Sequence, residues 1–165
     1  MEYSFDEGYL KVAFMEIHQI PSLRSPVMVI AFSGWNDAAE AATGALSHLL
    51  GSWTDPSFDV VPELIADVDP EEFYDFQVNR PQVSIDDSEI RSITWPGTQV
   101  FGLAIPSMER DLVIVTGVEP SMRWKHFTSD LLDLADDLEV SLVMTLGSLL
   151  ADTPHSRPIT VTGTG

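Results

Sequence analysis

The sequence predicts an α/β protein, namely a three-layer α/β/α sandwich with a mostly parallel sheet and one antiparallel hairpin. Three nearly continuous apolar runs, at residues 27–32, 111–116 and 140–146, have the pattern of strands that are buried on both faces. The first two runs are each followed by a turn and an amphipathic helix, the alternation that produces helix-covered parallel strands. The chain has 165 residues, 44% of them hydrophobic, which is enough for one domain with one core.

The first unit consists of the strand at 27–32, a polar turn at 33–37 and an alanine-rich helix. Asp37 occupies the position of a helix N-cap, and Glu40 stands three residues later, as in a capping box. Alanine and leucine recur at helical spacing as far as Leu50, which predicts that one face of this helix packs closely on the sheet.

Smaller elements are expected between the two units. Residues 59–66 have the composition of a strand, but Pro62 cannot donate a ladder hydrogen bond and indicates a sheet edge or a bulge. Residues 73–77 are expected to form a short helix or an ordered loop. Two segments of alternating polarity, 90–95 and 99–105, flank a Pro-Gly-Thr sequence, and this arrangement predicts a β-hairpin.

The second unit begins with the strand at 111–116, turns at 117–121 and continues into a helix whose apolar stripe includes Trp124 as a core residue. A buried strand at 140–146 and a last strand at 159–162 follow. Because a strand in this pattern is followed by a helix that covers the sheet, we expect these residues to be the N-terminal part of a longer chain, folded as a single domain.

The charge balance is strongly acidic. With 26 acidic and 8 basic residues the formal net charge is −18, so we expect nucleic acids and anionic membranes to be repelled. The acidity is either a solvating surface or a surface that recruits a basic partner. The chain has no cysteine, no secretory signal at its start and no apolar run of about 20 residues, which predicts a cytoplasmic protein without disulfides or a membrane span.

The loop at 33–37 contains residues suited to two kinds of chemistry. Gly34, Trp35 and Asn36 would line a site for a phosphate or carboxylate at the helix N-terminus, where backbone N–H groups attract anions. Asp37 argues against this site, because its own carboxylate would occupy the helix end. Ser33 is a candidate nucleophile, but neither a Gly-x-Ser-x-Gly elbow nor a phosphate-binding glycine motif is present. A plain strand-to-helix turn is the alternative.

Two further loops, at 117–121 and after the strand at 140–146, are expected at the same rim, where ligands of open α/β sheets bind. Glu119 either caps the following helix or acts as a general base. The group of Asp152, His155 and Arg157 lies in a proline-stiffened segment and is suited to acid–base chemistry, to anion binding or to a rigid interface. Too few ligands converge for a metal site, and neither a metal nor a cofactor is expected.

Two surfaces have alternative interpretations. The aromatic residues Phe73, Tyr74 and Phe76, with Arg80, form an interface-like patch if they protrude and core under the sheet edge if they are buried. The second helix is expected to have an acidic outer face, which is either solvated or a docking site for a basic partner. Its residues are Asp130, Asp133, Asp136, Asp137 and Glu139.

Four motifs in order along the chain resemble a known family. They are FSGWNDA at 32–38, EEFYDFQVNRP at 71–81, TGVEPSMRW at 116–124 and TLGSLLADTPHSRPITVTGT at 145–164. Together they are similar to the proteasome assembly chaperone family, in the branch that resembles the second assembly chaperone, and to its actinobacterial members. The match extends from about Val27 onward.

The resemblance implies a fold similar to nucleoside phosphorylases and hydrolases, homo-oligomers that include trimers, and a role in protein assembly with proteasome subunits as expected partners. Our leading hypothesis is a non-enzymatic assembly or binding protein that makes contacts through Trp35, Tyr74, Phe76 and Arg80. The alternative is a phosphorylase- or hydrolase-type enzyme or small-molecule binder that acts at the rim formed by Ser33, Asn36, Asp37, Glu119, Asp152 and His155. An ATP-dependent carboxylate–amine ligase is a third, for which no nucleotide-binding loop is visible.

Overall fold

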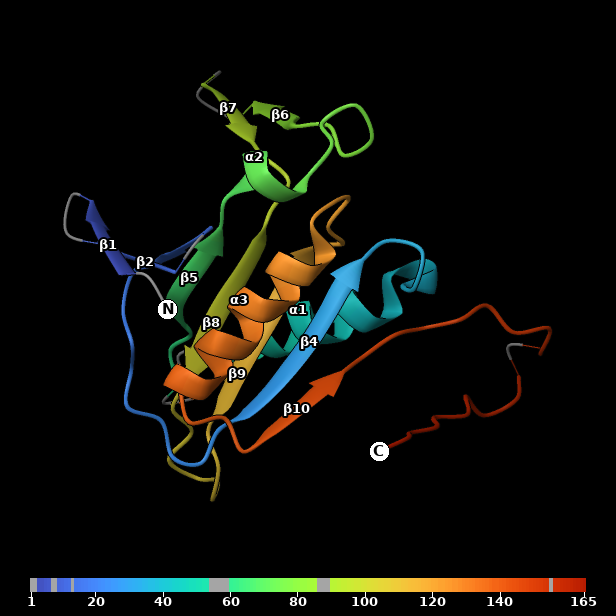
Figure 1. The fold of residues 1–165 in the computed structure, drawn as a ribbon. Helices are drawn as coiled ribbons and strands as arrows, with labels where there is room; N and C mark the ends of the chain where they lie inside the picture. The colour runs from blue at the N-terminus through green and yellow to red at the C-terminus, as the bar shows by residue number, and fades with distance from the viewer. Residues whose placement is uncertain (1–2, 7–8, 13, 54–59, 86–89, 155) are drawn as a thin grey trace.

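The computed structural model describes residues 3–6, 9–12, 14–53, 60–85, 90–154 and 156–165. They form an eight-stranded sheet with helices on both faces, and a separate two-stranded hairpin projects beyond one end of the sheet (Figure 1). The strands of the sheet, in spatial order, are β1 (Tyr3–Asp6), β2 (Tyr9–Val12), β3 (Met15–Ile17), β5 (Glu63–Val68), β8 (Thr98–Leu103), β9 (Leu112–Val118), β4 (Val27–Ser33) and β10 (Leu142–Thr145).

The sheet is mixed in direction. β4 lies between β9 and β10 and runs parallel to both, whereas all the other neighbouring strands pair antiparallel. The predicted α/β class is confirmed, but the prediction of a mostly parallel sheet is wrong. The reason is that β8 runs antiparallel to both of its neighbours, β5 and β9, and β1 to β3 extend that antiparallel half.

The hairpin predicted over 90–105 is wrong, although a strand occurs in each of its halves. β7 (Arg91–Thr94) pairs with β6 (Gln82–Ile85) in the projecting hairpin, whereas β8 lies inside the sheet. Trp95, Pro96 and Gly97 separate β7 from β8. A proline biases the residue before it towards extended backbone, so the chain runs on from one strand to the next without reversing.

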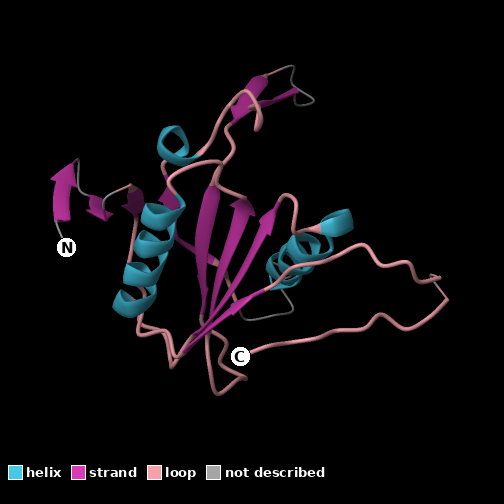
Figure 2. Cartoon of the chain, turned by 45° about the vertical axis from the view of Figure 1, so that its right-hand side comes forward, coloured by secondary structure: helices cyan, strands magenta, loops and turns pink. Residues whose placement is uncertain are grey.

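The two long helices cover opposite faces of the sheet (Figure 2). α1 (Ala41–Trp53) follows a short 3-10 turn, η1 (Ala38–Glu40), and α3 (Trp124–Asp137) follows β9. The remaining helix, α2 (Pro70–Phe73), is a single turn in which the Asp69 side chain accepts the N–H of Glu71.

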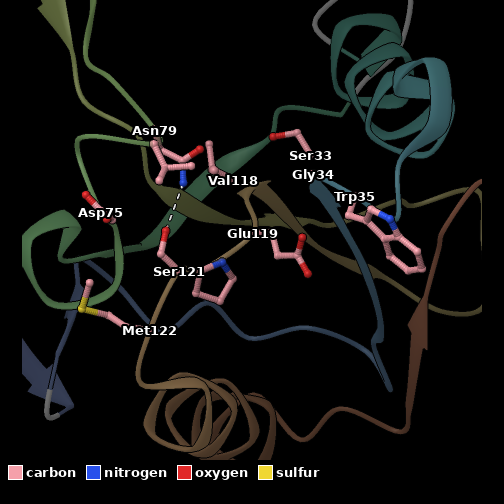
Figure 3. Close-up of a pocket in the computed structure, with 11 residues that line it drawn as sticks. Ser33, Gly34, Trp35, Asp75, Asn79, Val118, Glu119, Ser121 and Met122 are labelled. Atoms are coloured by element: carbon pink, nitrogen blue, oxygen red, sulfur yellow. Dashed lines mark hydrogen bonds between the residues drawn. The ribbon is translucent and has the colours of Figure 1, made fainter.

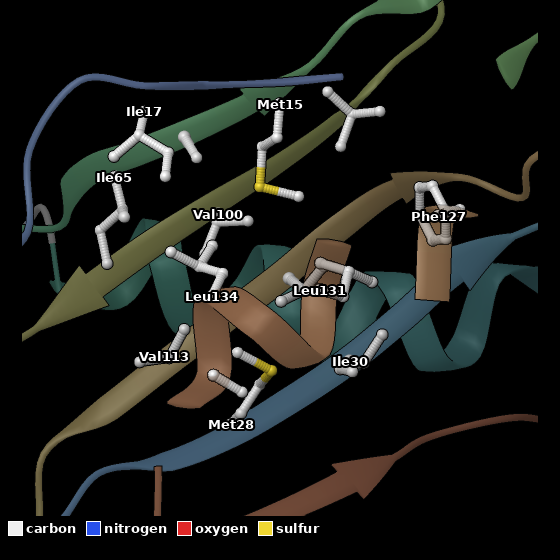
Figure 4. Close-up of a cluster of buried hydrophobic side chains, with 14 of the residues drawn as sticks. Met15, Ile17, Met28, Ile30, Ile65, Val100, Val113, Phe127, Leu131 and Leu134 are labelled. Carbon is white, nitrogen blue, oxygen red and sulfur yellow. The ribbon is translucent and has the colours of Figure 1, made fainter. Parts of the chain in front are cut away.

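Strand β4 illustrates how an apolar run serves two cores. Met28 and Ile30 pack in the cluster under α3, whereas Val29 and Ala31 pack with Leu46 on the α1 face (Figure 4 shows the cluster under α3). Successive side chains of a strand point to opposite faces, so a strand covered on both sides needs apolar residues at every position. The predictions of buried strands at 27–32 and 111–116 are confirmed.

The apolar stripe of α3 forms as predicted, with Phe127 at its centre and the Phe73 ring edge-on to it at 5.4 Å. Two details differ from the prediction. Trp124 is 45% exposed, because it lies at the first residue of the helix, beyond the covered part of the stripe. Asp130 is buried and does not belong to the acidic outer face, and burial raises the pKa of its carboxyl group.

The last part of the chain differs most from expectation. β10 was predicted to be buried, but it is the edge strand of the sheet and its four residues are exposed. Residues 159–162 form no strand, and the Ile159 and Val161 side chains are more than 90% exposed. In the described part of the chain β10 pairs only with β4, so its other edge and its faces lack a neighbouring element.

Strand β5 begins directly after Pro62, so this proline is not a residue of the ladder. The ladder between β5 and β8 does shift register, between Leu64 and Ala66 and not at Pro62. β5 is not an edge strand, because it pairs on both sides and Pro62 precedes its first residue. No helix within the described ranges is both long enough and apolar enough to cross a membrane.

Candidate functional site

The loops after β4, β9 and β10 meet at one rim of the sheet, as expected for strands that run parallel. The N–H of Glu119 donates to the carbonyl of Ser33 at 2.9 Å, and the N–H of Ala38 donates to the carbonyl of Ser148 at 3.1 Å. These backbone hydrogen bonds fix the three loops relative to one another.

Two adjoining hollows lie along this rim. The smaller, of about 470 Å³, is enclosed by the loop after β4, the loop after β9 and the segment that follows α2 (Figure 3). The larger, of about 710 Å³, continues along the base of the β6–β7 hairpin. They share Val78, Asn79 and Val118, so they adjoin, and together they are called the rim groove below. Ligand pockets commonly have volumes of about 300–1,000 Å³.

Two glycines let the loops of the rim approach one another closely. A Cβ on Gly34 would lie 2.5 Å from Oε2 of Glu119, and a Cβ on Gly117 would lie 2.2 Å from the carbonyl oxygen of Gly97. Both glycines have φ values, +156° and +158°, that side-chain-bearing residues rarely adopt. At Gly117 the close neighbour is the backbone of Gly97, and at Gly34 it is the Glu119 side chain, so both positions favour glycine.

Asp37 holds the start of α1. Its buried carboxylate accepts the N–H of Ala42 at 2.7 Å, the N–H and hydroxyl of Thr43, and the hydroxyl of Ser148 at 3.2 Å. Burial alone would raise the pKa of Asp37, but these hydrogen bonds outweigh it and lower the pKa. The carboxylate therefore occupies the positive helix end, as expected for a capping residue. Glu40 does not complete a capping box, because its φ of +54° turns the backbone out of the helix.

Ser33 and Asn36 are both occupied with backbone contacts. The Ser33 hydroxyl donates to the carbonyl of Gly117 at 3.2 Å, and no described side chain is placed to accept its proton. The backbone carbonyl of Asn36 accepts the N–H of Ser148 at 2.8 Å. Asn36 does not line either of the two hollows. The Asn36 Oδ1 is buried without a hydrogen-bond partner in the described part of the chain. This arrangement favours the turn over the nucleophile for this loop.

Glu119 and Trp35 stand together at one end of the smaller hollow (Figure 3). Glu119 is half-buried against Gly34, and its carboxylate has no hydrogen bond or ion pair with any described residue. Trp35 is 88% exposed, so nearly its whole ring faces solvent. At the other end, the Asn79 amide donates to the Ser121 hydroxyl at 3.2 Å and joins the two walls.

Tyr74 is not part of an exposed patch, and its prediction as a surface contact is wrong. The ring is buried with Phe73, and its hydroxyl hydrogen-bonds to that of Thr98 at 2.7 Å. Burial raises the pKa of Tyr74 to about 12. Phe73, the last residue of α2, and Tyr74, directly after it, therefore belong to the core that supports the groove.

Phe76 and Arg80 remain at the surface. Phe76 is half-buried against the exposed ring of Trp95, with 4.9 Å between the ring centroids. Arg80 is exposed and lines the larger hollow together with Trp95. These residues mark the point where the groove reaches the base of the hairpin.

The predicted group in the last loop does not join the groove. Asp152 and Arg157 are exposed on a segment without regular structure that extends away from the sheet edge (Figure 1). His155 lies outside the described residues. Within the described ranges, no three acidic or histidine side chains lie close enough together to hold a metal ion.

The β6–β7 hairpin is a feature that the sequence interpretation missed. Its register pairs Val83 with Ile93 and Ile85 with Arg91, so these four side chains share one face. The opposite face is polar, and there the hydroxyls of Ser84 and Ser92 lie 2.6 Å apart. Val83, Ile85 and Ile93 are each about 60% exposed. Period-two alternation in 82–85 and 91–94 was the signal that could have revealed this hairpin.

Comparison with known proteins places the chain among actinobacterial structures. A PAC2 family protein from Streptomyces avermitilis is 50% identical over 81% of this chain, with a TM-score of 0.70. A proteasome-assembly chaperone homologue from Mycobacterium tuberculosis is 45% identical over 80%, with a TM-score of 0.70. A protein of unknown function from the same organism is 26% identical over 95%, with a TM-score of 0.77. No curated protein matches significantly.

The chain spans about half the length of these relatives, covering 54%, 53% and 53% of them respectively. The PAC2 family model matches residues 31–165, which include all four of the motifs quoted above. The resemblance to the proteasome assembly chaperone family is thereby confirmed, and the chain belongs to the PAC2 family.

Proposed function

We propose that the protein is a non-enzymatic assembly factor that binds other proteins, proteasome subunits among them. The observation that carries this proposal is the apolar face of the β6–β7 hairpin, formed by Val83, Ile85 and Ile93. The homologue from Mycobacterium tuberculosis that is named as a proteasome-assembly chaperone supports the choice of partner.

The hairpin face has the properties of a binding surface. An isolated two-stranded hairpin is at best marginally stable in water, because one pair of strands buries too little apolar surface. Contiguous exposed apolar side chains bordered by polar ones are typical of protein interaction sites. A partner that covers this face would stabilise the hairpin and remove its apolar side chains from water. Homo-oligomers, including trimers, would use the same kind of surface.

Two adjacent substitutions on β7 test this proposal. Ile93→Asp places a charge on the apolar face, and Ser92→Asp adds the same charge on the polar face. Capture of purified proteasome α and β subunits by the full chain should fall about tenfold or more for Ile93→Asp. It should change less than about twofold for Ser92→Asp. Sedimentation velocity of the same variants reports self-association.

The outcomes separate clearly. If the chain captures no more subunit than an unrelated acidic protein does, the assembly role is rejected. If both variants bind as well as the parent chain, the hairpin is not the contact surface. Equal melting temperatures of the two variants would show that a difference in capture does not arise from unfolding.

A small-molecule ligand of the rim groove is the second candidate, favoured by the size of the two adjoining hollows. A bound ligand stabilises the folded state by mass action. A thermal-shift screen of nucleosides, nucleotides and phosphate should therefore raise the melting temperature if the groove binds one of them. The absence of any shift would remove this candidate.

A further inference from the structure

We propose that the smaller hollow of the rim, between Trp35 and Glu119, receives a basic side chain, arginine or lysine, of a protein partner. The inference rests on the proposed protein-binding function and names the chemistry that the partner presents.

Glu119 supplies the negative charge. Its side chain is half-buried, Oε2 lies over the backbone of Gly34, and the carboxylate has neither a hydrogen bond nor an ion pair with any described residue. The Glu119 N–H donates to the carbonyl of Ser33, which fixes the backbone from which the side chain projects. A carboxylate that is partly removed from water without a partner is unfavourable, and a cation in the hollow would compensate it.

The walls of the hollow suit the aliphatic part of a basic side chain. Val118, Pro120 and Met122 contribute apolar surface to the lining of the hollow. The Trp35 ring is 88% exposed and lies at the same end of the hollow as the carboxylate (Figure 3). Indole is the best aromatic partner for a cation, and long basic side chains keep their methylene groups on apolar surface while the charged end reaches a polar group.

The surrounding charges disfavour an anionic occupant. No lysine or arginine lines the smaller hollow, whereas Asp75 stands at its far side. The Asp75 carboxylate accepts the N–H of Gln77, so it already has a hydrogen bond. The end of α1 offers no anion site either, because Asp37 occupies it. With a net charge of −18, the chain as a whole attracts cations.

The test uses two minimal probes, N-acetyl-arginine methylamide and N-acetyl-lysine methylamide, with N-acetyl-norleucine methylamide as the uncharged control. Binding is followed by the indole N–H resonance of Trp35 in ¹⁵N–¹H spectra of the chain, assigned with Trp35→Phe. We expect a saturable shift with millimolar affinity for at least one basic probe and none for the norleucine probe.

A matched pair of variants locates the charge. Glu119→Gln should weaken binding about tenfold, because a charge-assisted contact is lost. Glu109→Gln removes the same charge from an exposed position before β9, at the opposite end of the strand, and should leave binding unchanged. A saturable shift that is equal in the two variants would overturn the proposal, as would the absence of any saturable shift.

The probes need no protein partner, so this test is independent of subunit capture. If the basic probes fail while the chain still captures subunits, the pocket assignment is wrong and the assembly role stands. If the probes bind at Glu119 but no subunit is captured, the pocket assignment stands and the partner has to be sought elsewhere.

Discussion

Asp111 ties the segment before β4 to the start of β9. Its buried carboxylate accepts the Arg24 guanidinium and the backbone N–H of Arg24, both at 2.7 Å, and the N–H of Ile105 at 2.8 Å. The hydrogen bonds from Arg24, with the Ile105 N–H and the attraction of the guanidinium, lower the pKa of Asp111 to about 2 against the opposing effect of burial. A single residue thereby holds together three chain segments at the end of the sheet opposite the groove.

Asp111→Asn should reduce the free energy of unfolding at neutral pH by on the order of 2 kcal/mol. Because the folded-state pKa is depressed, the stabilisation is complete above the unfolded pKa of about 4 and is lost as the pH falls towards about 2. Urea unfolding of both proteins between about pH 2 and pH 7 measures the difference. Protonation of the other carboxylates affects both proteins alike, so the difference between the curves isolates Asp111. Parallel curves would contradict the prediction.

At the scale of elements, the sequence predicted those strands and helices whose apolar pattern lies within a single segment. The apolar runs of β4 and β9 and the apolar stripe of α3 were predictable. Each pattern follows from the backbone geometry of its element, a strand buried on both faces or an amphipathic helix. The pairing partner of β7 was not predictable, since the pairing depends on residues in another segment, β6, which are 6 to 12 positions away. The exposure of β10 was not predictable either, because an apolar run does not reveal whether a neighbouring element covers it.

The candidate site was predictable to a similar degree. The meeting of the loops after β4 and β9 followed from their parallel strands, and the capping role of Asp37 followed from its position before the helix. The burial of Tyr74 was not evident, because its hydroxyl partner Thr98 is remote in sequence. The half-buried position of the Glu119 carboxylate was not predictable either, because it results from packing against Gly34, a residue that only folding brings close.

Two glycine-to-alanine substitutions should change the free energy of unfolding in opposite directions. Gly117→Ala in β9 would bring Cβ to 2.2 Å from the Gly97 carbonyl, which also accepts the N–H of Val118, and should destabilise the fold by about 2–4 kcal/mol. Gly44 in α1 has open space around it, so Gly44→Ala should stabilise by about 0.5–1 kcal/mol. Urea or thermal unfolding of the two variants tests both signs. A stabilising effect of Gly117→Ala would show that Gly117 in β9 is not in contact with the backbone of Gly97.

At the scale of the whole molecule, the apolar and charged surfaces are segregated. In the described residues of the hairpin, 82–85 and 91–94, the apolar face carries one charged side chain, Arg91, which is basic. The acidic residues Asp136, Asp137 and Glu139 instead gather in exposed positions at the end of α3. Among the described residues, no carboxylate lies on the apolar face of the hairpin, where burial under a partner would make a carboxylate oppose binding.

The net charge of −18 should make salt act in opposite directions on folding and on binding. Screening shortens the range of electrostatic forces from about 30 Å at 0.01 M salt to about 3 Å at 1 M. Self-repulsion in the folded chain therefore weakens, and the urea midpoint of unfolding should rise with sodium chloride. Capture of a basic partner should weaken over the same range, mainly through a slower association rate. If capture were insensitive to salt while the urea midpoint rose, the acidity would be a solvating surface only, and the apolar hairpin face would dominate partner binding.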